Sequence, residues 1–142
     1  MTIHQLSIFL ENRSGTLIKV LDQLKEANIQ IIASTIADTA EYGIYRLICS
    51  EPLRAYECLK NAGIAVALSD VFALELDNHP GRAADAIKVF SKADISIAYM
   101  FSFLFKGKGI LVFRTDNAEL ARQAIIENDL SFVPEDDLTA WV

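Results

Sequence analysis

The sequence predicts an α+β protein made of two β-α-β-β-α-β units packed side by side, each an antiparallel sheet with helices on one face. Three observations lead to this fold class. The 142-residue chain repeats itself at an offset of 66 residues, which aligns Leu10 with Leu76 and Gly43 with Gly109. In both halves, alternating or β-branched apolar runs flank segments with helical spacing. Turn residues separate these runs at matching places.

The repeat indicates an internal duplication. Without any gap, the identical pairs are Leu10/Leu76, Asn12/Asn78, Gly15/Gly81, Ala27/Ala93, Ile29/Ile95, Ile31/Ile97, Gly43/Gly109, Ile44/Ile110 and Ala55/Ala121. The alternative is a chance alignment of two α/β stretches, which would need gaps to keep four elements in phase. We therefore expect one domain at residues 1–69 and a second at residues 70–142 with a short C-terminal tail. Units of this size are small, so we expect the halves to share a core.

In the first half, a strand at residues 5–10 alternates apolar and polar side chains. A helix follows from about Ser14 to Ala27, because apolar residues recur there at helical spacing. Strands are expected at residues 29–38 and 43–49. Pro52 is suited to the first turn of a second helix and Gly63 to its end. Residues 64–68 form the fourth predicted strand.

The second half follows the same order, beginning with a strand at residues 71–76 and a helix that carries Phe90 on its apolar face. Residues 95–105 and 109–114 are expected to form a hairpin. Asp116, with Glu119 three residues later, resembles a capping box that starts the next helix. Residues 130–133 form the last predicted strand, which Pro134 ends. Each half therefore has the ferredoxin-like arrangement.

Composition argues against several classes of protein. The formal net charge is −6 and the chain has no basic cluster, so it has no electrostatic footprint for nucleic acid. The longest apolar run, residues 95–105, is far shorter than the about 20 residues of a membrane span. We find no leader segment and expect a cytosolic protein. The hydrophobic content of 52% suggests a buried subunit face, and we expect a homodimer.

Catalytic motifs are missing from the sequence. It has no nucleophile elbow, zinc-protease, phosphate-loop or dinucleotide motif. His4 and His79 are isolated, whereas a metal site needs several ligands. Ser14 has no nearby histidine to activate it. We therefore expect no enzyme activity, no metal and no cofactor.

A turn is repeated in both halves. Residues 11–15 (ENRSG) and 77–81 (DNHPG) each run from the end of a strand, through Asn-x-x-Gly, into a helix. A helix N-terminus attracts carboxylates, and glycine allows a ligand to approach the backbone. The alternative is that these residues only make a tight turn and cap the helix. The residue types by themselves favour this alternative.

The run IFLENRSGTLIKVLDQLKEANIQI resembles the opening of an ACT domain. The matching residues are Glu11, Ser14, Gly15, Leu17, Val20, Leu24, Asn28 and Ile29. GIYRLI is similar to the third strand of that family. The segment LDNHPGRAADAIKVFSKADISI resembles the same motif, with Asp94 where the family often has asparagine. The resemblance covers nearly the whole chain, as two tandem ACT domains.

This resemblance implies regulatory binding of a small molecule, usually an amino acid, between two ACT units. Backbone groups at the strand edges would hold the amino and carboxylate groups of the ligand. The first implied site pairs Asn12, Arg13, Ser14, Gly15, Thr16 and Leu17 with Ile95, Ser96 and Ile97. The second pairs Asn78, His79, Gly81, Arg82 and Ala83 with Ile29, Gln30 and Ile31. Because Arg13 aligns with His79, and Thr16 with Arg82, we expect the two sites to differ in affinity or one to be empty.

Two other functions stay open. The chain could be a non-catalytic regulatory subunit or assembly module that docks an enzyme of amino-acid metabolism, since Tyr99, Phe101, Phe103 and Phe105 could form a subunit face. We favour the expectation that these aromatic residues line the core between sheet and helices. Acylphosphatases share the ferredoxin-like fold and have an arginine in the first loop, where Arg13 stands. Nothing else in the sequence supports that activity.

Overall fold

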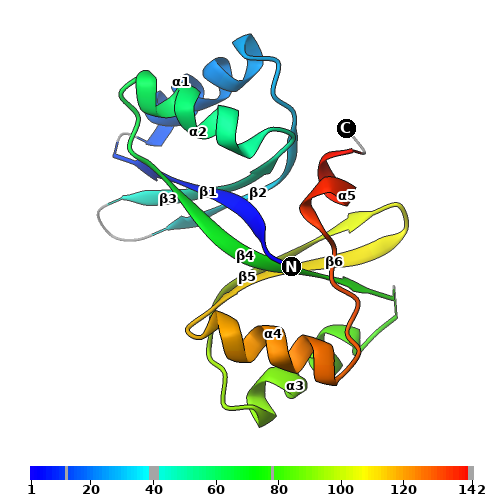
Figure 1. Ribbon diagram of the computed structural model, residues 1–142. Coiled ribbons are helices and arrows are strands. Elements are labelled where there is room, and N and C mark those ends of the chain that lie inside the picture. Colours follow the sequence, from blue (N-terminus) through cyan, green and yellow to red (C-terminus); the bar gives the residue numbers. More distant parts are fainter. Residues whose placement is uncertain (12, 39–41, 78, 141–142) are drawn as a thin grey trace. The chain divides into compact units, whose positions relative to one another are not determined.

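The computed structural model describes residues 1–11, 13–38, 42–77 and 79–140 (Figure 1). These residues form six antiparallel strands and five helices, which confirms the predicted α+β class with ferredoxin-like units. In chain order the elements are β1 (Ile3–Leu10), α1 (Arg13–Glu26), β2 (Ile31–Asp38), β3 (Gly43–Cys49), α2 (Pro52–Asn61), β4 (Val66–Leu76), α3 (Arg82–Lys92), β5 (Ile97–Phe105), β6 (Lys108–Thr115), α4 (Ala118–Glu127) and α5 (Glu135–Thr139).

Two compact units make up the chain. One contains His4–Asp70 together with residues 136–140 of the tail, and the other contains Met1–Ile3 with Val71–Glu135. The expected boundary between residues 69 and 70 falls inside β4. We predicted separate strands at residues 64–68 and 71–76, and this was wrong, because β4 is continuous. Ser69 and Asp70 include neither glycine nor proline, so nothing there interrupts an extended backbone.

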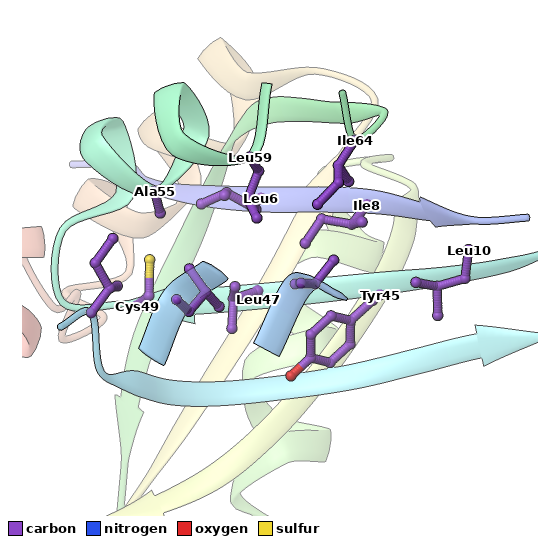
Figure 2. Packing of buried hydrophobic residues seen from close by; sticks show 12 residues of the cluster. Leu6, Ile8, Leu10, Tyr45, Leu47, Cys49, Ala55, Leu59 and Ile64 are labelled. Carbon is purple, nitrogen blue, oxygen red and sulfur yellow. The ribbon is translucent and has the colours of Figure 1, made fainter. Parts of the chain in front are cut away.

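In the unit containing His4–Asp70, the strand order is β2-β3-β1-β4, and α1 and α2 lie on one face of the strands (Figure 1). β1 alternates as predicted, and Leu6, Ile8 and Leu10 are buried. Figure 2 shows them packed with residues of β3 and α2. The buried cluster comprises Leu6, Ile8, Leu10, Val20, Leu24, Ile29, Tyr45, Leu47, Cys49, Ala55, Leu59 and Ile64. Burying each large aliphatic side chain contributes about 1.5–3 kcal/mol of transfer free energy.

In the unit containing Val71–Glu135, the strand order is β4-β6-β5, with α3 and α4 on one face (Figure 1). Phe113 is central to its core, with ring centroids 5.6 Å from Phe72 and 4.9 Å from Phe90. The last predicted strand, residues 130–133, is reduced to an isolated bridge between Leu74 and Phe132. The described residues therefore form six strands and not the eight that the two halves predicted.

The duplication is visible in the structure. Helices α2 and α4 start and end at positions that are 66 residues apart. The residues that follow α1 and α3 both have left-handed backbones, with φ of 56° at Asn28 and 58° at Asp94. A register shift between β2 and β3 at Ala33 recurs between β5 and β6 at Tyr99. The two halves thus share local geometry as well as element order.

The start of α4 differs from the prediction by one residue. The N-cap is Asn117, whose Oδ1 accepts a hydrogen bond from the backbone N of Leu120 at 3.1 Å. Asp116, which we expected to cap the helix, instead accepts a hydrogen bond at Oδ1 from the backbone N of Ser96 at 3.1 Å. The Asp116 carboxylate therefore holds the start of β5, and the side-chain amide of Asn117 caps α4.

The aromatic residues of β5 do not line the core between sheet and helices, as we expected. Met100 pairs with Phe113 and Phe101 pairs with Val112 across the β5–β6 ladder. Directly opposite residues of an antiparallel pair point to the same face. Because Phe113 packs against α3 and α4, Phe101 and its alternating neighbours lie on the opposite face. These neighbours, Tyr99, Phe103 and Phe105, are half-buried there, like Phe101.

The tail contains a helix that we did not predict. α5 is short, and its Leu138 is 1% exposed. Trp141, which we expected to pack against the protein, lies outside the described residues. None of the helices that the described residues form is both long and apolar enough to cross a membrane.

Candidate ligand-binding site

The two repeated turns have different backbones. In the first half, α1 begins at Arg13, so Gly15, Thr16 and Leu17 already lie within the helix. In the second half, α3 begins only at Arg82, and Gly81 before it has a left-handed φ of 89°. Glycine adopts this conformation without the steric strain that a Cβ atom would add. Asn12 and Asn78 lie outside the described residues.

The first turn borders a small pocket. Thr16, which we predicted as a site residue, lines a volume of about 130 Å³ together with Glu11, Lys19, Phe9 and residues 63–65. Ligand pockets usually measure about 300–1,000 Å³. The pocket at Thr16 is therefore smaller than the usual small-molecule site.

Carboxylates already neutralise the arginine of the second turn. Arg82 Nε lies 3.8 Å from Asp77 Oδ2, and Arg82 Nη1 lies 3.3 Å from Asp85 Oδ2. His79, Gly81, Arg82 and Ala83 are exposed. The turn therefore presents a paired cation, which is less able to recognise an anion than a lone arginine would be.

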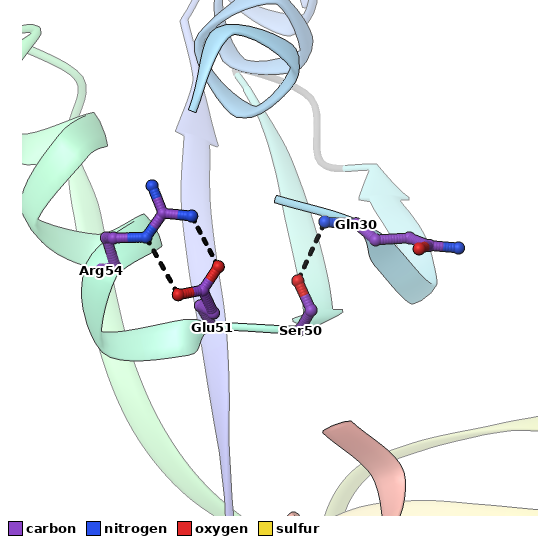
Figure 3. Close-up of polar contacts among 4 residues, drawn as sticks. All are labelled: Gln30, Ser50, Glu51 and Arg54. Atoms are coloured by element: carbon purple, nitrogen blue, oxygen red, sulfur yellow. Dashed lines mark hydrogen bonds and ion pairs between the residues drawn. The ribbon is translucent and has the colours of Figure 1, made fainter. Parts of the chain in front are cut away.

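The predicted residues at the start of β2 are held in place by a reciprocal pair of hydrogen bonds. Gln30 N donates to Ser50 Oγ at 2.9 Å (Figure 3), and Ser50 N donates to the carbonyl of Gln30 at 2.9 Å. Ile29, the residue before Gln30, is 6% exposed and packs in the core, which anchors the start of the strand. Its N–H donates to the carbonyl of Leu24 at 2.9 Å, which closes the end of α1. We call the Gln30–Ser50 pair a bracket.

The second unit has the same bracket. Ser96 N donates to Asp116 Oδ1 at 3.1 Å, and Asp116 N donates to the carbonyl of Ser96 at 3.3 Å. Ile95 is 6% exposed, like Ile29. The next residues, Ile31 and Ile97, begin β2 and β5. The implied strand-start residues thus occupy equivalent places in both units.

A cleft of about 550 Å³ opens at the start of β2. It is lined by Lys25, Asn28, Ile29, Gln30, Ser50, Glu51 and Thr139. Two of these, Ile29 and Gln30, were predicted site residues. The others come from the end of α1, the β3–α2 connection and the tail helix, which sequence reasoning missed. The volume is within the usual range for a small-molecule site.

The cleft carries both signs of charge. Lys25 supplies an ammonium group in the last turn of α1. Glu51 supplies a carboxylate, which Arg54 holds with hydrogen bonds of 3.1 Å from Nε and 2.5 Å from Nη2 (Figure 3). These hydrogen bonds lower the pKa of Glu51 below its ordinary value, so it stays ionised at neutral pH. Separated positive and negative groups in one polar cleft suit a small zwitterion.

The described residues contain no cluster of side chains that would bind a metal ion. No group of three or more histidine, cysteine, aspartate or glutamate side chains there could hold a metal ion.

A family model described as "ACT domain pair" matches residues 1–142. The chain belongs to this family. The ACT domain pair is similar over nearly its whole length to a crystallised protein from Bacteroides thetaiotaomicron, with 36% identity, a TM-score of 0.92, and coverage of 98% of this chain and 96% of that chain. No curated protein sequence matches the chain.

More distant structures share the fold of this ACT domain pair. The regulatory subunit of aspartate kinase from Thermus thermophilus has 14% identity and a TM-score of 0.60, covering 87% of this chain and 91% of that chain. The corresponding subunit from Thermus flavus has 16% identity and a TM-score of 0.56, covering 87% and 90%. The family model therefore confirms the prediction of two tandem ACT domains.

The ACT assignment supports a ligand-binding, regulatory role for the chain. Within the unit containing His4–Asp70, the structure brings Ile29 and Gln30 into one cleft and places Thr16 at a separate pocket. The pairing of each turn with the strand start of the other half stays a prediction.

Proposed function

We propose that this ACT domain pair is a cytosolic, non-catalytic regulatory protein that binds a free amino acid and reports it to another protein. The observation that carries this proposal is the cleft at the start of β2, where Lys25 and Glu51 offer opposite charges. In this proposal one ACT domain occupies residues 1–69 and the other residues 70–142.

The cleft chemistry suits an amino acid. The α-carboxylate would lie near Lys25 and the α-ammonium near Glu51, while Asn28 and Gln30 would contact its side chain. An amino acid has about 10 heavy atoms, and about 0.5–0.8 kcal/mol per atom gives about 5–8 kcal/mol of binding free energy. This corresponds to dissociation constants from about 0.1 mM down to about 1 μM.

The repeated turns are part of the same proposal. By the family resemblance, the turn residues Asn78, His79, Gly81, Arg82 and Ala83 would contact a ligand as well. Replacing Gly81 with aspartate should then abolish binding at the turn, because it adds a charged side chain where the turn would contact the ligand. Replacement of Gly63, a second glycine with positive φ, by aspartate is the control for strain, since Gly63 belongs to neither turn.

Thermal-shift measurements with each of the twenty amino acids test the proposal. A ligand at one hundred times its dissociation constant stabilises the folded chain by about 2.7 kcal/mol. For a chain of this size, we expect the Tm to rise by about 5–10 °C with one or a few amino acids. The corresponding amines without the carboxylate serve as controls and should have little effect. A flat response from folded protein to all twenty would count against the proposal.

The second candidate function is a subunit that docks an enzyme of amino-acid metabolism. Its support is β5, an edge strand on which Met100 is 51% and Leu104 is 69% exposed. Light scattering with and without the bound amino acid measures the homodimer that we expect and any change in assembly. A mass that never changes, together with purification free of any enzyme, would remove this candidate.

A further inference from the structure

Resting on the proposed function, we propose that each chain binds one amino acid and not two, and that Lys25 determines which of the two equivalent positions is occupied. The cleft at Lys25 takes a carboxylate-bearing zwitterion. The position that the duplication makes equivalent in the other unit, at Ser91, Asp94 and Asp116, rejects carboxylates.

The strand starts at the two positions have nearly the same backbone, so we attribute the proposed difference in binding to the side chains around them. Asn28 and Asp94 have φ values of 56° and 58°. The brackets close at 2.9 Å and 3.1 Å, from Gln30 N to Ser50 Oγ and from Ser96 N to Asp116 Oδ1. A ligand would therefore meet strand starts of the same shape in both units.

The side chains at the two positions differ in charge. The residue equivalent to Lys25 is Ser91, so the second position lacks the ammonium group. Asn28 and Ser50 of the first position are replaced by Asp94 and Asp116, which add two carboxylates. The first position thus contains a cation for a carboxylate, whereas the second presents two anions to it.

The other charges near the two positions cancel or are absent. In the first unit, Arg54 pairs with Glu51 of the cleft, so this pair adds no net charge. In the second unit, the equivalent residues are Leu120 and Asn117, which are uncharged. Lys92 is next to Ser91 in sequence, but it lines a different cleft with Asp85, Lys88, Val89, Ala93 and Asn128.

The expected size of the discrimination follows from elementary electrostatics. At about 6 Å in a water-like environment, each like charge weakens carboxylate binding about three- to tenfold. Removing the ammonium of Lys25 also removes a charged hydrogen bond, so we expect Lys25→Ser to weaken binding about 10- to 100-fold. Together these effects weaken amino-acid binding at the second position by about 10²- to 10⁴-fold relative to the first.

Nuclear magnetic resonance and calorimetry on the full chain test the inference, with each of the twenty amino acids as the probe. We expect the amides of Gln30 and Ser50 to shift on titration while those of Ser96 and Asp116 stay unchanged. Calorimetry should give one amino acid per chain. These two measurements use the wild-type protein, so they do not depend on whether any variant folds.

Variants exchange the charges between the two positions. Lys25→Ser should weaken binding, whereas the matched control Lys92→Ser should not, although both lysines lie in the last turn of equivalent helices. The combined change Ser91→Lys, Asp94→Asn and Asp116→Ser should create a second binding event. Circular dichroism confirms that each variant is folded.

The outcomes separate this inference from the proposed function. Two amino acids per chain, shifts at Ser96 and Asp116 with similar affinity, or unchanged binding by Lys25→Ser would each overturn the inference and leave amino-acid binding intact. If no amino acid binds the wild-type protein, the proposed function and the inference both fall.

Discussion

Ser50 should have two separable roles, one in holding the start of β2 and one in keeping negative charge out of the cleft. Its hydroxyl accepts the Gln30 N–H at 2.9 Å, and its side chain lines the cleft. Ser50→Ala removes the acceptor and adds no charge. Ser50→Asp copies the residue that performs the same task in the other unit, Asp116, so it keeps an acceptor and adds a charge.

The magnitudes differ for the two substitutions. A typical hydrogen bond contributes about 0.5–1.5 kcal/mol net, and Gln30 is exposed enough for water to replace the lost acceptor. We therefore expect Ser50→Ala to lower the free energy of unfolding by about 0.5–1 kcal/mol. Ser50→Asp should leave it within about 0.5 kcal/mol of the wild-type value. Its extra carboxylate should weaken amino-acid binding about three- to tenfold.

Urea denaturation and amide hydrogen exchange measure the structural role, and calorimetry measures the binding role. In Ser50→Ala the amide of Gln30 should exchange several-fold faster, with an unchanged m-value. Unchanged exchange at Gln30 would refute the structural role of the bracket. Wild-type affinity in a folded Ser50→Asp variant would refute the electrostatic account of the cleft, because the added carboxylate would then have no effect on ligand binding.

Three further predictions concern stability and ionisation. Leu59 is 0% exposed, so Leu59→Ala should lower the free energy of unfolding by about 2–5 kcal/mol in urea denaturation. Its control Leu53→Ala, at a side chain that is 58% exposed, should change it by less than about 0.5 kcal/mol. Asp129→Gly should raise the free energy of unfolding by up to about 1 kcal/mol, because φ at Asp129 is 52° and glycine adopts this left-handed backbone more readily than aspartate does. A lower free energy of unfolding would contradict this account. Hydrogen bonds from Arg54 lower the pKa of Glu51 below its ordinary 4.5. The Arg54–Glu51 pair therefore stabilises the folded chain at any pH above the pKa that Glu51 has in the unfolded chain. This stabilisation is lost as the pH falls through the lower pKa that Glu51 has in the folded chain. In Arg54→Gln, carbon NMR of Glu51 should show a higher pKa than in the wild-type protein; an unchanged titration would mean that Arg54 is not the cause.

Local signals in the sequence predicted most of the fold. Pro52 starts α2 as expected, and Gly63, with a φ of 80°, follows its end. The residues Lys106 and Gly107, both with positive φ, make the predicted hairpin turn between β5 and β6. Such features depend on one to four neighbouring residues, so they can be recognised without any knowledge of tertiary structure.

Features that depend on distant residues could not be predicted in the same way. The alternation in β5 shows that Phe101 shares a face with its second neighbours, but it does not show which face meets the helices. That choice is set by the register with β6, in which Met100 lies opposite Phe113. Since β5 is apolar on both faces, the usual rule that the apolar face is the inner one does not apply.

The lining of the cleft also depends on residues that are distant in the sequence, so it could not be predicted from local patterns. The family resemblance led to Ile29 and Gln30, whereas Lys25, Glu51 and Thr139 come from three separate segments. No spacing in the sequence connects them. The duplication, however, could have revealed the bracket, because Ser50 and Asp116 stand at equivalent places and both can accept a hydrogen bond from a strand start.

A comparison of the two halves separates the positions that maintain the fold from those that can carry specificity. Ala55 and Ala121 are identical and are both 0% exposed, because a larger side chain there would have to displace a packed core. The polar positions around the strand starts, such as Lys25 and Ser91, are exposed and have diverged in charge. Exposed side chains can change charge at little cost in stability. The duplication thus keeps two equivalent strand starts while their charges differ, which is the condition needed for one of them to bind a zwitterion that the other excludes.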